Sequence, residues 1–235
     1  TAFCALVVPI NMTGVLSGLP TPEELHSHIF AGPIKNALAE ESYGQVIYAG
    51  TVTDWVNVTP QTLNVFSAPF EVTEYFSENN INPAQYEQIV FLVNGGTQSY
   101  GGEASIGSTY FYVNGSNIYI PVALVGFGTY QYNNNLTSSN GNLSHFDYLY
   151  VHETGHNMNA LHDNLLNCKS GPASLPSECI HVEYGNKYSI MGDGAYGGHF
   201  SFFQKLRAGW INPSSITFSS NGAFSLNSLE LPSPS

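Results

Sequence analysis

The sequence predicts one mixed α/β (α+β) domain, in which a twisted mixed sheet with helices precedes a loop-rich C-terminal part. A continuous apolar run at 3–10 and a second segment at 86–94, whose central residues 89–93 are all apolar, are typical of strands that are buried on both faces. Between them, Thr21 is followed by a proline and two glutamates, which is the pattern of a capped helix start. The chain has 235 residues, of which 43% are hydrophobic, so one sizeable core can form. We expect this domain to have two unequal lobes, residues 1–159 and 160–235.

Turn residues divide the rest of the chain into short elements. We expect the helix that begins at Thr21 to break near Gly32 and then to resume. Alternating apolar residues in 45–56 predict one or two strands around a bend at Gly50. The other expected elements are the resumed helix to about Ala39, a helix at 70–79, β segments at 109–113 and 118–125 that resemble a hairpin at the sheet edge, a long helix from Ser144 to about Met158, and a short helix at 202–208.

The charge balance excludes several classes of partner. Five Lys and Arg residues stand against seventeen Asp and Glu residues, which gives a formal net charge of −12. A basic patch that could neutralise phosphates cannot be assembled from so few cations, so we expect no binding of nucleic acid or anionic lipid. The sequence contains no run of about eighteen apolar residues, so membrane insertion is not expected either. We expect the protein to be a monomer.

The cysteines and the first residue indicate an extracellular protein. Cys168 and Cys179 lie eleven positions apart in a segment rich in Gly, Pro and Ser, where a disulfide would stabilise the fold by roughly 2–4 kcal/mol. Cys4 lies in an apolar run and is expected to be a buried thiol. The chain begins at Thr1, without a methionine or a signal sequence. We therefore expect a secreted protein that is processed from a longer precursor.

His152, Glu153 and His156 form an HExxH pattern within the expected long helix. Residues four positions apart lie on one face of a helix, so both imidazoles can bind the same ion. Glu153, the next residue along the helix after His152, would lie near the open coordination position of that ion and could act as a base without being a ligand. The pattern therefore indicates a catalytic metal site.

His162 follows His156 by six residues and completes the pattern HExxHxxxxxH. Three nitrogen ligands with a fourth position open to water are the arrangement of catalytic zinc. For His162 to reach the same ion, the chain must leave the helix abruptly, which requires a residue that tolerates a positive φ. Asn159 occupies that position, and asparagine adopts this conformation more readily than other non-glycine residues. We therefore expect one zinc ion bound by His152, His156 and His162.

Residues 152–163 and the later turn at 188–192, which contains Met191, resemble the metzincin zinc peptidases. The pattern of that family is HExxHxxGxxH followed by a methionine-containing turn below the metal. Asn159 stands where the family usually has glycine. More loosely, the stretches at 42–55, 183–185 and 204–211 are similar to the gametolysin-like branch, with the immune-inhibitor-A-like peptidases a close second.

The resemblance implies a secreted zinc-dependent endopeptidase that hydrolyses peptide bonds in proteins. Glu153 would be the general base that activates the zinc-bound water, whose pKa zinc lowers toward about 7. Met191 would form an apolar floor below the metal. Asp163 is expected to orient an imidazole or tie the lobes together, although a carboxylate can also replace His162 as the third ligand. Several metzincins have a tyrosine two residues after the methionine, where this chain has Asp193, so no residue is assigned to stabilising the oxyanion.

Two other interpretations are open at this point. In a gluzincin-type site, the third ligand beside the two histidines of HExxH is a glutamate further along the chain. Glu178 and Glu183 are available for this role. A non-catalytic, zinc-stabilised adhesive module would suit a surface rich in Asn, Ser and Tyr. Glu153 argues against such a module, because a structural zinc site is normally closed by four protein ligands and needs no adjacent base. No acidic loop motif supports a calcium site.

Overall fold

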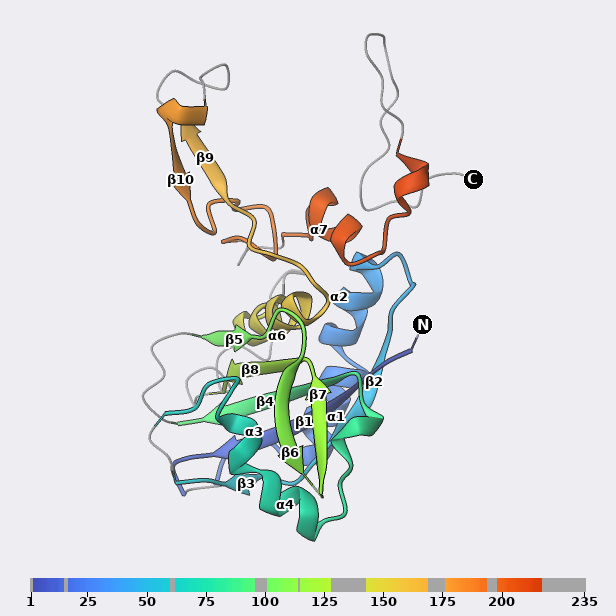
Figure 1. Cartoon of the computed structure of the whole chain (residues 1–235), viewed down its shortest axis with the longest axis vertical. Coiled ribbons are helices and arrows are strands. Elements are labelled where there is room, and N and C mark those ends of the chain that lie inside the picture. Colours follow the sequence, from blue (N-terminus) through green and yellow to red (C-terminus); the bar gives the residue numbers. More distant parts are fainter. Residues whose placement is uncertain are drawn as a thin grey trace.

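The computed structural model describes residues 2–14, 17–59, 62–95, 101–113, 115–127, 143–168, 176–193 and 198–216, and it confirms the mixed α/β fold class (Figure 1). In this part of the chain, the central sheet has six strands in the order β2-β1-β4-β8-β5, with β3 also paired to β1. All of these pairs are parallel except β5, which runs antiparallel to β8. The strands are β1 (Ala2–Asn11), β2 (Ile47–Val52), β3 (Val56–Asn57), β4 (Gln88–Asn94), β5 (Gly102–Ala104) and β8 (Val122–Gly126).

Helices cover both faces of this sheet. Residues of α1, α2 and α6 form one core with alternate residues of the central strands, and α3 and α4 form a second core on the opposite face. Figure 1 shows α6 lying between the sheet and the segment that follows it. The helices are α1 (Pro22–Phe30), α2 (Pro33–Glu41), α3 (Ala68–Glu71), α4 (Thr73–Glu78), η1 (Pro83–Gln85), α6 (His145–Asn157), η2 (Pro176–Glu178), α7 (Phe202–Arg207) and η3 (Pro213–Ser215).

The two apolar runs are the central strands β1 and β4, as the sequence predicts. In β1, Ala5 and Val7 face the core of α1 and α6, whereas Leu6 and Val8 face the core of α3 and α4. Because both faces of the strand are covered, every one of these positions is buried and must be apolar. A strand with one solvated face would show alternation instead.

The predicted helix start and its interruption are also confirmed. The Thr21 hydroxyl accepts a hydrogen bond from the Glu24 backbone N–H (3.2 Å), and the Glu24 carboxylate accepts one from the Thr21 N–H (2.8 Å). This reciprocal capping satisfies two N–H groups that the first turn of α1 would otherwise leave unpaired. α1 ends at Phe30, and α2 begins at Pro33.

Gly50 does not bend the chain as the sequence suggested, because β2 continues through it. The glycine is required by a close approach instead. A Cβ at this position would lie 2.0 Å from the carbonyl oxygen of Ala5 and 2.6 Å from Cζ of Phe30. Its lack of a side chain therefore lets α1 pack directly on the β1–β2 pair.

We expect Gly50→Ala to lower the free energy of unfolding by about 1–3 kcal/mol, because the added methyl overlaps a backbone atom that cannot move aside freely. Thr51→Ala, at the next and exposed position of β2, is the matched control and should change it by less than about 0.5 kcal/mol. Urea unfolding followed by circular dichroism measures both. Equal stabilities for the two variants would contradict the close approach.

The hairpin expected at the sheet edge is correct in part. β6 (Thr109–Val113) and β7 (Ser116–Ile120) are antiparallel, but they form a separate two-stranded sheet. Residues 122–126 are not the end of this hairpin; they form β8, between β4 and β5. The sequence did not separate the two because Pro121 is the only break in an otherwise apolar run. The helix expected at 70–79 is likewise divided into α3 and α4.

In the described residues after α6, the regular elements are short. The short helix α7 is present where the sequence places it. An antiparallel hairpin of β9 (Leu165–Cys168) and β10 (Cys179–Val182) was not foreseen. Among the described residues, no helix has the length and apolar character that crossing a membrane requires.

Candidate metal centre

The HExxH pattern lies on α6, whose first turn is fixed by polar contacts. The Ser144 hydroxyl accepts a hydrogen bond from the Asp147 N–H (3.1 Å) and so caps the helix at the residue where the sequence places its start. The buried Asp147 carboxylate also accepts a hydrogen bond from His28 Nε2 of α1 (2.5 Å). The start of the helix is therefore fixed both by its own cap and by a neighbouring helix.

The last turn of α6 is tied to the sheet. The Asn157 side chain donates hydrogen bonds to the carbonyl oxygens of Ser105 (2.8 Å) and Val122 (3.1 Å). Its own oxygen accepts a hydrogen bond from the Gln88 side chain of β4 (2.7 Å). These bonds fix the rotation of the helix about its axis, and hence the direction of the side chains on its other faces.

The chain leaves α6 at Asn159, which has a φ of +73°. The Ala160 N–H donates to the carbonyl of Gly155, and the Asn159 N–H donates to that of His156, both at 2.9 Å. This is the paired hydrogen-bond pattern of a left-handed helix end. Arg207 of α7 donates to the backbone oxygen and the side-chain oxygen of Asn159 (2.9 and 3.0 Å), which stabilises the turn.

The turn brings His162 to the two histidines of α6. One possible ligand atom from each of His152, His156 and His162 lies within 4.8 Å of the others. The Nε2 atoms of His156 and His162 are 3.0 Å apart. The sequence-predicted histidines are therefore together in space.

Each imidazole is oriented by a hydrogen bond from its Nδ1. His152 donates to the Ile190 carbonyl (2.7 Å), His156 donates to the Ala160 carbonyl (2.9 Å), and His162 donates to the Glu183 carboxylate (2.8 Å). With Nδ1 protonated, the neutral ring presents the lone pair of Nε2. All three lone pairs are thus available to one ion.

This donor set fits zinc. Zn–N bonds of about 2.0–2.1 Å in a tetrahedron place two nitrogen ligands about 3.3 Å apart, close to the separation of the His156 and His162 nitrogens. Burial lowers the pKa of His152 to about 3, with His156 as the next cause, and burial also lowers the pKa of His156. Both rings are therefore neutral at pH 7, as metal ligands must be.

Glu153 lies beside this cluster and faces the edge strand of the sheet. Burial raises its pKa to about 8, and the neighbouring carboxylate of Glu103 contributes. A Cβ at Gly102 would lie 2.5 Å from Oε1 of Glu153, so the glycine in β5 makes room for the carboxylate. Glu153 is thus a buried carboxyl group beside the histidine cluster, and its raised pKa favours the protonated form. A carboxyl group of this kind can exchange a proton with a molecule held nearby.

Met191 is fully buried beneath α6. A Cβ at Gly155, between the two histidines of the helix, would lie 2.8 Å from the Met191 sulfur and 2.7 Å from the ring of Phe200. The glycine therefore allows an apolar floor of Met191 and Phe200 to pack directly against the helix backbone. The sequence pointed to Met191 but gave no signal for Phe200.

Asp163 points away from the three histidines. Its carboxylate accepts hydrogen bonds from Ser189, from Ser201 (3.1 Å) and from the Gln204 side chain (2.8 Å), and its N–H donates to the Met191 carbonyl (2.8 Å). These contacts join the chain after His162 to the Met191 turn and to α7. The geometry supports the structural interpretation of Asp163 over a ligand role.

Tyr184 borders the cluster and was missed as a site residue. Its ring centre lies 3.9 Å from that of His162 and 6.0 Å from that of His152. Burial raises the pKa of its hydroxyl, with Glu183 as the next cause. A φ of +58° directs this side chain over the histidines, and that backbone conformation leaves no clear signal in the sequence.

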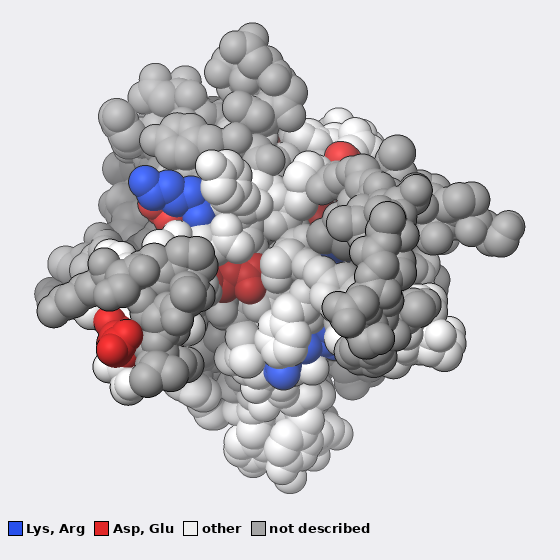
Figure 2. All heavy atoms as spheres, turned by 90° about the horizontal axis from the view of Figure 1, so that it is seen from above, with Lys and Arg blue, Asp and Glu red and all other residues white. Residues whose placement is uncertain are grey.

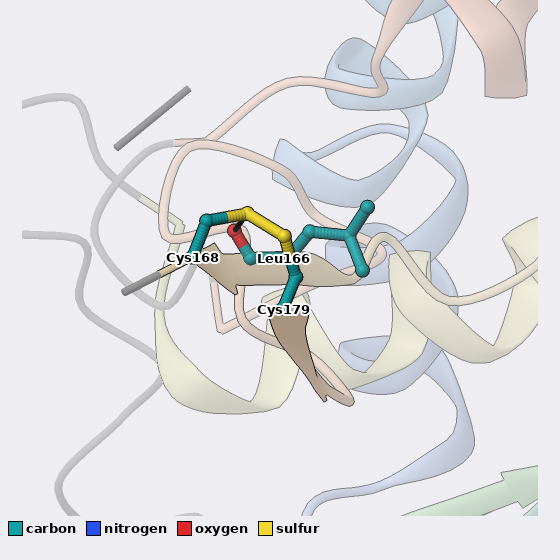
Figure 3. Close-up of a disulfide and its surroundings, with 3 residues drawn as sticks. All are labelled: Leu166, Cys168 and Cys179. Atoms are coloured by element: carbon teal, nitrogen blue, oxygen red, sulfur yellow. Dashed lines mark hydrogen bonds between the residues drawn. A yellow bond between two sulfur atoms is a disulfide. The ribbon is translucent and has the colours of Figure 1, made fainter. Parts of the chain in front are cut away.

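The hairpin β9–β10 leaves the site between His162 and Glu183, and the predicted disulfide closes its far end. Figure 3 shows Cys168 of β9 and Cys179 of β10 joined through their sulfurs. Cys4, in contrast, is a free thiol that is only partly buried, so the expectation of a buried thiol holds only partly. The disulfide fixes the register of a hairpin whose side chains are largely exposed.

Comparisons with known proteins show a similarity at the level of the fold. Neither a protein-family model nor a curated protein matches the sequence. Among solved structures, the chain is similar to metalloproteinase-II from Bacteroides fragilis, with a TM-score of 0.50, 16% sequence identity, and coverage of 88% of this chain and 52% of that chain. A chaperone–substrate complex has a TM-score of 0.40 and 11% identity over 90% of this chain and 35% of that one, which is too weak for any argument. The chain therefore spans about half the length of metalloproteinase-II, and the similarity shows a metalloproteinase-like two-lobe fold.

Proposed function

We propose that the protein is a zinc-dependent endopeptidase that hydrolyses peptide bonds in proteins, with His152, His156 and His162 as the ligands of one ion. The observation that carries this proposal is the convergence of three imidazoles next to a buried carboxyl group, Glu153. Three nitrogen ligands leave a coordination position open, which is the feature that separates catalytic from structural zinc sites. The metalloproteinase-like fold is consistent with it.

Within this proposal, each residue of the site has a separate role. A bound zinc ion would supply Lewis-acid polarisation of the scissile carbonyl and a lowered pKa for an attacking water. Glu153 would take the proton of that water and pass it to the leaving amine. Glu183 and the carbonyl of Ile190 would hold the rings of His162 and His152 in the orientation required for binding, and Met191 would close the site from below.

The edge strand β5 offers a place for the substrate chain. β5 is the last strand in the order of the central sheet, and Glu153 reaches Gly102 within it. An extended peptide can add to such an edge through backbone hydrogen bonds without regard to its sequence. A peptide aligned there would pass in front of Glu153, which suits an endopeptidase that acts within a chain.

The gluzincin-type alternative is less well supported. Glu183 contacts Nδ1 of His162 and therefore acts on the side of the ring that faces away from the other two histidines. Glu178 lies in η2, next to Cys179 at the disulfide-bonded end of the hairpin. No observation favours an adhesive module over an enzyme.

The proposal extends to location and assembly. The disulfide is typical of proteins that leave the cytoplasm, which supports a secreted protein. We infer a monomer with lobes of residues 1–159 and 160–235. Figure 2 shows isolated Lys and Arg groups, and no continuous basic patch, on the described surface of one face. The proposed substrates are proteins or peptides. A place within the metzincins, in the gametolysin-like branch, belongs to the same proposal.

Removal of the metal tests the proposal directly. The purified protein is expected to contain one zinc per chain and to cleave unfolded casein. Treatment with 1,10-phenanthroline should abolish cleavage, and addition of zinc after removal of the chelator should restore it. Mass spectrometry of the metal content and an assay with labelled casein measure the two effects. Cleavage that survives complete removal of zinc would contradict the proposal, and a zinc-loaded protein without any cleavage would favour the adhesive module.

A further inference from the structure

A second cluster of buried charge joins α2 to the segment after α6. The Glu41 side chain, at the end of α2, is 3% exposed, and the Lys205 side chain of α7 is 1% exposed. Their charged atoms are 3.0 Å apart, and the Lys205 ammonium lies 4.6 Å from the centre of the Tyr43 ring. The desolvation of a buried ion pair often offsets its Coulombic attraction. Stability alone is therefore a weak reason for a chain with only five Lys and Arg residues to bury one of them.

Glu41 has two further partners, and both lie in the C-terminal segment. Its carboxylate accepts a hydrogen bond from His199 Nδ1 (2.6 Å) and another from the Phe200 backbone N–H (3.0 Å). One carboxylate thus holds two consecutive residues and the lysine of α7. These contacts connect parts of the chain that are about 160 positions apart.

The backbone of His199 is hydrogen-bonded to the segment that contacts the metal centre. The His199 carbonyl accepts a hydrogen bond from the Ile190 N–H, and the His199 N–H donates to the Tyr188 carbonyl, both at 3.1 Å. Ser189 and His199 form a short parallel bridge there. The Ile190 carbonyl in turn accepts the hydrogen bond from Nδ1 of His152.

Phe200 provides a second route from Glu41 to the same helix. Its ring is fully buried and lies against Gly155, between the two histidines of α6. Because the Glu41 carboxylate accepts a hydrogen bond from the Phe200 N–H, it fixes the backbone from which this ring extends toward Gly155. Glu41 is therefore connected to the metal centre in two separate ways: through His199 and the Ile190 backbone, and through the Phe200 ring.

We propose that Glu41 is a positioning residue for the metal centre, an inference that rests on the proposed function. Its carboxylate fixes residues 199–200, which place the Ile190 carbonyl under His152 and the Phe200 ring under Gly155. Lys205 supplies the buried counter-charge that the carboxylate needs while it accepts these hydrogen bonds. Glu41 acts only through these neighbours.

The test compares variants of the full-length protein. Glu41→Gln removes the charge and keeps the shape of the side chain. A second protein, with Glu41→Met and Lys205→Met together, removes both charges at similar volume, so that no buried charge is left unpaired if the single variant fails to fold. Glu40→Gln, at the neighbouring exposed position of α2, is the matched control.

Two measurements separate positioning from stability. Competition with a chromophoric chelator should show zinc affinity reduced by about tenfold in both Glu41 proteins. This is the lower end of the loss that is typical for a direct hydrogen-bond partner of a ligand, because Glu41 acts on the ligands only through its neighbours. Amide hydrogen exchange of the metal-free proteins should be faster at Ile190, whose N–H bonds to His199. The control should match the wild type in both respects.

Each outcome decides the inference. Unchanged exchange at Ile190 would overturn it, and so would unchanged zinc affinity in folded Glu41 variants, since a purely structural pair would lower the melting temperature alone. If the wild-type protein bound no zinc, the proposed function would fail. The exchange rates, which need no metal, would then decide whether Glu41 holds the floor of the site.

Discussion

Replacing Glu153 with glutamine is expected to lower kcat/KM for peptide hydrolysis by about 10²–10⁴-fold, the usual contribution of a general base. The amide has nearly the same shape as the carboxylate but cannot accept a proton from water at neutral pH. The three histidines are untouched, because none of their Nδ1 hydrogen bonds involves Glu153. Zinc content should therefore remain at one per chain.

Steady-state cleavage of a fluorescent peptide and mass spectrometry of bound metal check this result together. Glutamine is neutral, so it suits a position where burial already disfavours the charged carboxylate. The variant is accordingly expected to fold, which circular dichroism can verify. A zinc-loaded Glu153→Gln protein with activity within tenfold of the wild type would remove Glu153 from the mechanism.

The second large effect is expected at His162. His162→Ala removes one of three ligands and should lower zinc affinity more than any change outside the ligand set. Glu183→Gln removes only the carboxylate that accepts the hydrogen bond from Nδ1 of His162, and it should lower the zinc affinity about tenfold. This is the lower end of the usual range, because 61% of the Glu183 side chain is exposed and its hydrogen bond is weakened by water.

Chelator competition on the three proteins, with Glu178→Gln as the unaffected control, ranks the candidates for the third ligand. The expected order of loss is His162, then Glu183, with no change at Glu178. A larger loss at Glu183 than at His162 would favour the gluzincin-type site. Equal, small losses at both positions would mean that α6 holds the ion with its own two histidines and other groups.

Much of the site could be predicted because its signals are local. The cap at Ser144, the pair of His152 and His156 and the left-handed turn at Asn159 each depend on residues within about six positions. The position of His162 follows from that turn. The central strands β1 and β4 could be predicted for a similar reason, since burial on both faces leaves an unbroken apolar run.

Other features could not be predicted because their partners are distant in sequence. His28 meets Asp147 across 119 positions, and Glu41 meets His199 across 158. Neither histidine has a spacing that distinguishes it from a surface residue. The hairpin β9–β10 was missed because its short strands are exposed and carry no alternation, and Tyr184 was missed because its direction depends on a positive φ.

The amino-acid sequence by itself determined the class of the fold and the clustering of His152, His156 and His162, since helix periodicity and one left-handed turn are encoded by neighbouring residues. Only the tertiary structure decided how the site is supported: which groups hold each imidazole, which side chains the Asp163 carboxylate contacts, and how Glu41 reaches residues 199–200 beneath α6. The physical reason is that a hydrogen bond requires two groups within about 3 Å in a defined direction. Folding alone brings such groups together when more than a hundred residues separate them.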